Sequence, residues 1–199
     1  MARVATFAGV LLMVLAAAFP LAAQNDHGIE VSVFVGGNKP LQDLNTVPSA
    51  TFKTGIGAGA GVAVILDKNL ALRLDGSFAK SDITSGNLGN ALVSNSWSRI
   101  MIGADFVLRF PMENGITPYF TTGGGAVMFK EGSTGSLQGR SPTRAAGRFG
   151  AGLKFPIGDK LGIFGQANAW VYDFNQSQFT YFTKVQVDMA LTAGVSFTF

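Results

Sequence analysis

The sequence predicts an all-β fold: an eight-stranded antiparallel up-and-down transmembrane β-barrel, preceded by a cleaved signal peptide. Three observations lead to this prediction. The 199 residues include 26 glycines and 17 phenylalanines but few charged residues. After the N-terminal segment, no apolar run reaches the roughly 20 residues that a membrane-spanning helix needs. Apolar and polar residues instead alternate in steps of two, the period of a strand with two different faces.

The N-terminal segment has the pattern of a secretory signal peptide. A basic residue precedes an apolar run from Val10 to Phe19, and small residues follow. This run is shorter than a transmembrane helix requires. We expect cleavage between Ala23 and Gln24, so that residues 1–23 are the signal peptide and residues 24–199 form one β-barrel domain. The chain has no cysteine, so the exported domain has no disulfide to stabilise it.

The first four predicted strands each have one apolar face. In lipid, the apolar face of a barrel points outward. In chain order, these outward faces are Ile29, Val31, Val33 and Val35; Ile56, Ala58, Ala60, Val62 and Val64; Leu70, Leu72, Leu74 and Phe78; and Ile100, Ile102, Ala104, Phe106, Leu108 and Phe110. The intervening residues, rich in glycine in the second strand and carrying charges in the fourth, are predicted to face the lumen.

The last four strands continue this pattern with one exception. The fifth, residues 118–129, is rich in Thr and Gly, and its faces are not assigned. The other outward faces are Phe149, Ala151, Leu153 and Phe155; Leu161, Ile163, Ala167, Ala169 and Val171; and Val185, Val187, Met189, Leu191, Ala193, Val195, Phe197 and Phe199. Phe110, Phe155 and Phe199 lie at strand ends and are predicted to join an aromatic girdle at the membrane interface.

Short and long connections alternate along the chain. We expect short turns at 67–69, 111–115 and 156–160, and long polar loops at 38–53, 80–95, 130–144 and 173–183. Both chain ends then lie on the short-turn side, as in bacterial outer-membrane barrels with short periplasmic turns and long extracellular loops. About 11 residues per strand, tilted near 45°, would span the roughly 25 Å apolar band of that membrane.

The end of the chain carries a recurrent motif: a polar residue, a glycine two positions later, and two aromatic residues, here Thr192, Gly194, Phe197 and Phe199. With the signal peptide and the strand count, the mature chain resembles the small eight-stranded outer-membrane β-barrel family of the OmpA, OmpX and opacity-protein type. The resemblance implies that this motif is an assembly signal for the barrel-assembly machinery, after passage through the export machinery. It also implies that the protein lies in the bacterial outer membrane, among outer-membrane lipid and lipopolysaccharide. The resemblance covers only the barrel part of the OmpA type, and we expect no peptidoglycan-binding domain.

Charged residues of the inward faces would meet inside the barrel. The predicted lumen ionic network comprises Glu30, Arg73, Asp75, Arg99, Asp105, Arg109, Arg148, Lys154 and Asp188. An eight-stranded lumen is only wide enough for side chains to fill. We therefore interpret these nearly balanced charges as a plug of paired side chains, with a narrow channel as the alternative interpretation.

The sequence predicts no catalytic, cofactor-binding or metal-binding residues. The single histidine, His27, lies near the mature N-terminus and is interpreted as a solvated residue. The glycines of the GIGAGAG stretch do not have the spacing of a dinucleotide-binding fingerprint, and no helix follows them. A net charge of only +3 gives no reason to expect nucleic acid as a partner.

We therefore expect a monomeric, non-enzymatic barrel that serves envelope integrity or binds an extracellular ligand through its loops. The candidate contact residues are Phe52, Leu92, Trp97, Phe179, Tyr181 and Phe182, and the same residues fit the role of interfacial girdle anchors. Two alternatives from other classes stay open. One is a porin-like channel for small solutes, and the other is a lipid-modifying barrel enzyme.

Overall fold

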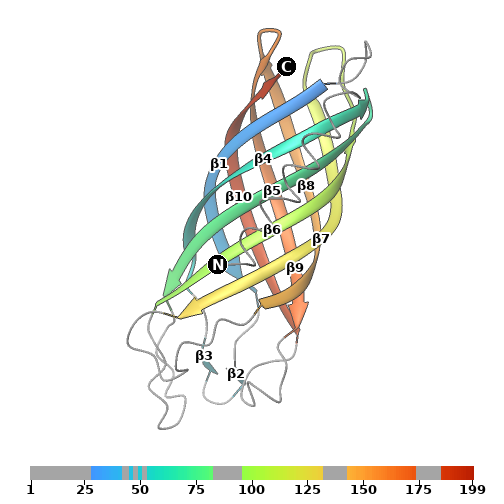
Figure 1. Ribbon diagram of the computed structural model, residues 1–199. Coiled ribbons are helices and arrows are strands. Elements are labelled where there is room, and N and C mark those ends of the chain that lie inside the picture. The colour runs from blue at the N-terminus through green and yellow to red at the C-terminus, as the bar shows by residue number, and fades with distance from the viewer. Residues whose placement is uncertain are drawn as a thin grey trace, which may run out of the picture.

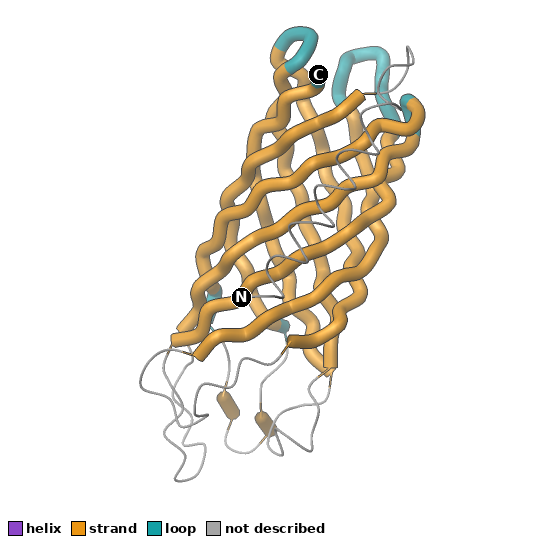
Figure 2. Tube along the Cα trace, viewed as in Figure 1, coloured by secondary structure: helices purple, strands orange, loops and turns teal. Residues whose placement is uncertain are grey.

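The computed structural model describes residues 28–41, 45–46, 49–50, 53–82, 96–131, 143–173 and 185–199. Within them, eight long antiparallel strands close into a barrel (Figure 1, Figure 2). The strands are β1 (Gly28–Pro40), β4 (Gly55–Asp67), β5 (Leu70–Asp82), β6 (Ser96–Arg109), β7 (Thr117–Glu131), β8 (Thr143–Ile157), β9 (Leu161–Asp173) and β10 (Val185–Thr198). The predicted fold class is confirmed.

Some predicted features fall outside the described residues. The signal peptide and its cleavage between Ala23 and Gln24 are among them, and so is His27. The loop candidates that fall outside as well are Phe52, Leu92, Phe179, Tyr181 and Phe182. In the ranges that are described, no helix is long and apolar enough to cross a bilayer.

Each barrel strand pairs with its neighbour along the chain, and β1 closes the barrel by pairing with β10. In this closing pair Val31 lies opposite Phe197 and Val35 opposite Ala193, while the other edge of β1 pairs with β4. The start of β1, the end of β10 and the three short turns lie at one end of the barrel (Figure 1). We call this the turn end and the opposite one the loop end.

Two of the three short turns contain a glycine in the left-handed region, with φ of 81° at Gly115 and 78° at Gly158. Only glycine adopts this conformation without a steric cost, which explains its presence at these turns. The third turn, at Lys68 and Asn69, joins β4 to β5. All three turns lie within or beside the ranges that the sequence predicts.

The strands are longer than the sequence predicts, with 13 to 15 residues each. At about 3.3 Å per residue and a tilt near 45°, they span roughly 30–35 Å, more than the roughly 25 Å apolar band. The predicted loop starts at residues 38 and 80 are therefore too early, because polar residues continue the strands to Pro40 and Asp82. A further short hairpin that the sequence does not predict, β2 (Asn45–Thr46) with β3 (Ser49–Ala50), lies in the first predicted loop.

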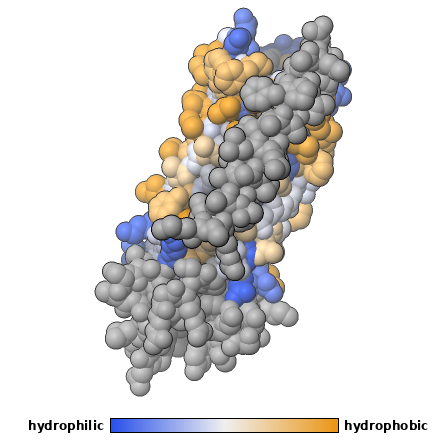
Figure 3. Space-filling view, viewed as in Figure 1, coloured by the Kyte–Doolittle hydropathy of each residue, from blue (hydrophilic) through white to orange (hydrophobic). Residues whose placement is uncertain are grey.

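The outer wall of the barrel is apolar. Outward side chains such as Ile56 (80 % exposed) and Leu191 (63 %) would contact lipid. Figure 3 shows apolar residues along the visible wall and hydrophilic residues toward both ends. The fifth strand, β7, follows the same alternation: Tyr119 and Thr121 are buried in the lumen, whereas Phe120 is exposed. This assigns the faces that the Thr- and Gly-rich sequence leaves open.

The core of the protein is the lumen, and glycines on its wall make room for large side chains. Phe34 on β1 and Phe164 on β9 meet there with ring centroids 6.5 Å apart. A Cβ added to Gly194 would lie 2.7 Å from the Phe164 ring and 2.8 Å from Cβ of Phe34. A Cβ added to Gly59 would meet the Phe34 ring from the other side. The glycines therefore set where the lumen is filled by aromatic rings.

Candidate functional site

The inward charged side chains meet in three clusters at different levels of the lumen. From the loop end to the turn end, these are the loop-end pair of Arg99 and Asp188; the central quartet of Arg73, Asp75, Asp105 and Arg148; and the turn-end pair of Glu30 and Lys154. Eight of the nine residues of the predicted network are in these clusters.

The loop-end pair is completely buried. Arg99 Nη1 donates to Asp188 Oδ2 at 2.5 Å, and both side chains are 0 % exposed. Arg99 Nη2 also donates to the hydroxyl of Ser81 at 2.5 Å, and the Tyr172 hydroxyl donates to Asp188 Oδ2 at 3.1 Å. Both charges therefore have an opposite charge and a further hydrogen bond, which a buried ion pair needs to offset the loss of hydration.

Aromatic rings fill the lumen at the same level. The Phe129 ring lies 6.1 Å from the ring of Trp97 and 5.6 Å from that of Tyr172, and all three side chains are buried. Both predicted roles of Trp97, as a loop contact residue and as an interfacial girdle anchor, are wrong, because β6 already begins at Ser96 and directs Trp97 into the lumen. The loop-end pair and these rings form one layer, which we call the loop-end layer.

The central quartet joins two arginines and two aspartates. Arg148 Nη1 lies 2.6 Å from Asp75 Oδ1 and 3.1 Å from Asp105 Oδ2. Arg73 Nη2 lies 3.1 Å from Asp105 Oδ2, and its Nε lies 3.3 Å from Asp75 Oδ2. Each arginine thus contacts both aspartates, and the quartet is neutral.

Polar and aromatic neighbours complete the quartet. Gln166 Oε1 accepts from Arg73 Nη1 at 2.7 Å and from the Tyr119 hydroxyl at 3.0 Å. The amide of Gln166 donates in turn to Asn168. The Arg148 guanidinium lies 4.8 Å from the ring centroid of Trp170, a distance suited to a cation–π interaction. These neutral groups, on β7 and β9, extend the network of the quartet, whose charges lie on β5, β6 and β8.

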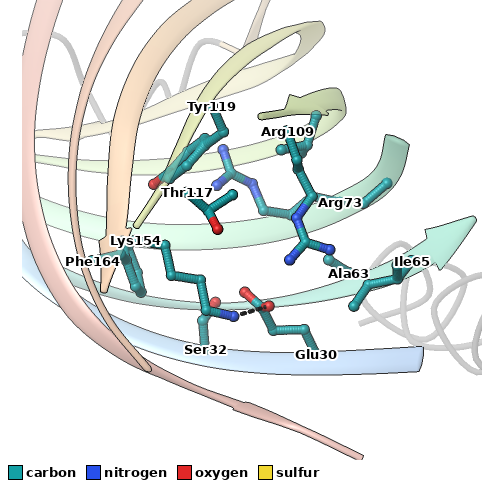
Figure 4. Close-up of a pocket in the computed structure, with 12 residues that line it drawn as sticks. Glu30, Ser32, Ala63, Ile65, Arg73, Arg109, Thr117, Tyr119, Lys154 and Phe164 are labelled. Carbon is teal, nitrogen blue, oxygen red and sulfur yellow. Dashed lines mark hydrogen bonds and ion pairs between the residues drawn. The ribbon is translucent and has the colours of Figure 1, made fainter. Parts of the chain in front are cut away.

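The turn-end pair links β8 to β1 through the ion pair of Lys154 with Glu30 (Figure 4). Its side chains are 16 % and 19 % exposed, so this pair is wetter than the other clusters. Arg109, the ninth residue of the predicted network, lines the same pocket but makes no ion pair with any described residue. Thr117 and Tyr119, on the strand that the sequence leaves unassigned, line it as well.

Small cavities separate the clusters. One of about 40 Å³ lies between the turn-end pair and Arg73, and one of about 10 Å³ lies beside Phe34 and the quartet. A third, of about 30 Å³, lies between the quartet and Met101 on the loop side. A water molecule needs at least about 10–15 Å³ of such space. These cavities fit isolated waters or small groups of waters rather than a water column through the lumen.

The residues of the predicted assembly signal lie on both faces of β10 and, for Phe199, directly after its end. Thr192 and Gly194 face the lumen, where the Thr192 hydroxyl donates to the carbonyl of Gln166 at 3.4 Å. Phe197 and Phe199 are 39 % and 71 % exposed on the outer face, with ring centroids 4.9 Å apart. Their recognition by assembly machinery stays a prediction.

The side chains of the three clusters are poorly suited to metal binding or to acid–base chemistry. Among the described side chains, no group of three or more His, Cys, Asp and Glu could hold a metal ion. The four carboxylates of the clusters are each held by an arginine or a lysine. A carboxylate held in this way is a poor base or nucleophile, because the neighbouring cation compensates its charge and favours the ionised form.

Comparisons with known proteins agree with this geometry. The family model described as "Outer membrane protein beta-barrel domain" matches residues 8–199. No curated protein matches the chain. Similar solved structures include Neisserial surface protein A (NspA), with 13 % identity and a TM-score of 0.62 over 86 % of this chain and 97 % of that one.

Two further solved structures come from Pseudomonas aeruginosa. The N-terminal β-barrel domain of OprF is 15 % identical, with a TM-score of 0.57 over 88 % of this chain and 100 % of that one. The outer membrane protein OprG is 11 % identical, with a TM-score of 0.55 over 90 % of this chain and 98 % of that one. At such identities, the similarity concerns the fold alone.

Proposed function

Because this chain belongs to the outer membrane protein beta-barrel domain family, we propose that it is a closed, non-enzymatic barrel that acts through its outer surfaces. Its role is surface binding through the long loops or the integrity of the envelope. The observation that carries the proposal is the loop-end layer, in which a fully buried ion pair and three buried rings fill the lumen. A barrel closed at this level acts through its wall and its loops rather than through its interior.

The other two clusters support closure. The central quartet is neutral, and each of its charges contacts two opposite charges. Opening a water path would require these pairs to separate, which is costly in a narrow lumen with a low dielectric constant. The cavities of about 10 to 40 Å³ between the clusters are too small for a continuous column of water.

The non-enzymatic role rests on the state of the carboxylates. A general base must lie within hydrogen-bond reach of the substrate proton that it removes. Asp75, Asp105 and Asp188 are buried and held by arginines, and Glu30 is held by Lys154. None of these four acids is therefore disposed for hydrolysis of a lipid or a peptide.

Conductance in a planar lipid bilayer tests closure. The purified, folded protein should give no steady conductance. The matched variant is Arg148→Gln with Asp75→Asn, which removes two opposite charges and leaves the net charge of the lumen unchanged. A stable ohmic conductance of the unmodified protein that changes in this variant would contradict the proposal and assign a channel function.

Complementation of a deletion strain separates the two surface roles. The strain is supplied with the unmodified protein or with a variant in which residues 174–184 are replaced by a Gly/Ser loop of equal length. Uptake of a hydrophobic dye measures envelope integrity, and adherence to an epithelial monolayer measures surface binding. Restored integrity with the loop variant supports an envelope role of the barrel, whereas adherence that depends on the loop supports surface binding. A deletion strain unchanged in both properties would contradict both roles.

A further inference from the structure

We propose that the turn end of the lumen binds a small phosphate-bearing anion, with Arg109 as its main contact residue. The site is a cavity of about 240 Å³, which we call the turn-end vestibule. Its polar lining comprises Arg109, Thr117, Lys154, Asp159, Lys160 and Thr198. This site is distinct from the loops that the proposed function uses.

The vestibule opens on the turn side of the barrel. Two turn glycines, Gly115 and Gly158, and the turn residue Lys160 form its rim. Toward the interior it continues into the cavity of about 40 Å³, because Arg109 and Lys154 line both spaces. A small solute can therefore enter from the turn end and reach side chains inside the barrel.

The charges around the vestibule do not balance. Its cations are Arg109, Lys154 and Lys160, whereas its anions are Glu30 at the inner side and Asp159 at the rim. Glu30 is already held by Lys154, and Lys160 and Asp159 are exposed to water at the rim. The positive charge that remains in the interior belongs to Arg109.

Arg109 differs from the inward arginines that belong to the three clusters. Those arginines all contact aspartates, whereas Arg109 makes no ion pair within the described part of the chain. Its contacts with Asn69 involve the backbone alone: its N–H donates to the carbonyl of Asn69 at 2.8 Å, and its carbonyl accepts from Asn69 Nδ2 at 2.8 Å. Its side chain is half-buried, and a guanidinium keeps its charge at any physiological pH. An uncompensated charge in a partly desolvated position favours binding of an anion.

The strand register gathers hydrogen-bond donors around this charge. Thr117 on β7 lies directly opposite Lys154 on β8, and Arg109 lies opposite Tyr119 at the end of β6. Figure 4 shows these four side chains around one pocket. The planar guanidinium matches two oxygens of a phosphate at once, and a lysine and a hydroxyl add further donors. Several donors around one uncompensated guanidinium favour a phosphate, which offers more acceptor oxygens than a carboxylate, and the volume suits inorganic phosphate or a small phosphate monoester.

Thermal unfolding of the folded protein in detergent tests the site with inorganic phosphate as the probe. Ionic strength is held constant by replacing chloride, and acetate serves as the carboxylate probe. A ligand that binds only the folded state raises the unfolding midpoint in a saturable manner. We expect this rise with phosphate and a smaller one with acetate. In Arg109→Gln the apparent affinity for phosphate should fall about tenfold or more, as for the loss of a charge-assisted hydrogen bond.

The matched control is Lys68→Gln, which removes an exposed lysine from a turn at the same end of the barrel but outside the vestibule. This variant should respond to phosphate as the unmodified protein does. If Arg109→Gln does not fold, Arg109→Lys keeps the charge but lacks the planar guanidinium that contacts two phosphate oxygens at once. This variant should bind phosphate more weakly than the unmodified protein does. The ³¹P resonance of inorganic phosphate should broaden when the unmodified protein is added, and this measurement of binding needs no variant. Absent broadening, a phosphate response unchanged in the Arg109 variants, or an equal response to acetate would each overturn the proposal.

Discussion

Replacing Asp188 with alanine should be among the most destabilising single changes in the lumen. The carboxylate accepts from Arg99 at 2.5 Å and from Tyr172 at 3.1 Å, and both partners of the ion pair are 0 % exposed. The substitution leaves the Arg99 guanidinium buried without its counter-charge. Removal of one partner from a buried pair typically costs about 3–5 kcal/mol, and we expect Asp188→Ala to lower the free energy of unfolding by this amount.

Two further variants separate the cost of an orphaned charge from the cost of a lost contact. Arg99→Met combined with Asp188→Leu removes both charges and keeps apolar volume, so it should cost less than Asp188→Ala alone. Glu30→Ala breaks the turn-end pair, whose side chains are 16 % and 19 % exposed. Because water still reaches that pair, its loss should cost about 1 kcal/mol or less.

Urea unfolding of the protein in lipid vesicles provides the measurement. The chain has two tryptophans, Trp97 and Trp170, and both are buried in the lumen. Their fluorescence therefore reports directly on the packing of the lumen, and the slower gel migration on heating confirms loss of the folded barrel. The reasoning fails if Asp188→Ala costs under about 1 kcal/mol, or if the double variant costs as much as the single one.

Three other predictions concern the wall, the packing and the end of the chain. Gly194→Ala should lower the free energy of unfolding by about 1–3 kcal/mol, because its Cβ would meet the backbone oxygen of Val33 and two aromatic side chains. Gly165→Ala, whose Cβ meets nothing within 4 Å, should change it little, and equal effects in urea unfolding would contradict the packing. Ile102→Arg, near the bilayer midplane, should lower the free energy of unfolding by about 2–4 kcal/mol, and Ile157→Arg, at a strand end, by about 1 kcal/mol or less. Similar costs of the two substitutions in vesicle unfolding would show that the depth assignment is wrong. Deletion of Phe199 should leave export intact but reduce the heat-modifiable folded form in outer-membrane fractions, and an unchanged amount would argue against its role in assembly.

The barrel could be predicted because its strands are lined by lipid on one side only. This contrast gives each strand an alternation that is visible in the sequence, as in the segment around Ile102 and Asp105. It disappears where both faces carry small residues, and for this reason the run from Thr121 to Gly125 gives no face. The ends of strands are equally hard to predict, because beyond the membrane both faces are polar. For the same reason the sequence alone places Trp97 among the loop candidates, although β6 begins at Ser96.

The charged clusters could be predicted only as a set of inward residues. The alternation of inward and outward residues places Arg99 and Asp188 in the lumen. Their pairing also depends on the stagger of strands that are far apart in the chain. The same stagger leaves Arg109 beyond the reach of an aspartate at the turn end. A count of inward charges treats all nine residues alike and does not distinguish the arginines that are paired from the one that is not.

The pairing of β1 with β10 has a consequence for the order of folding events. Until these two strands meet, any set of the other strands has two edges with unpaired backbone N–H and C=O groups. Each such group costs several kcal/mol in the hydrocarbon of a bilayer, where water is absent. A half-formed barrel is therefore not a stable inserted intermediate, and closure must accompany insertion. Because the closing contacts join residues near the two ends of the described chain, such as Glu30 and Thr198, their formation has a high contact order and is expected to be slow.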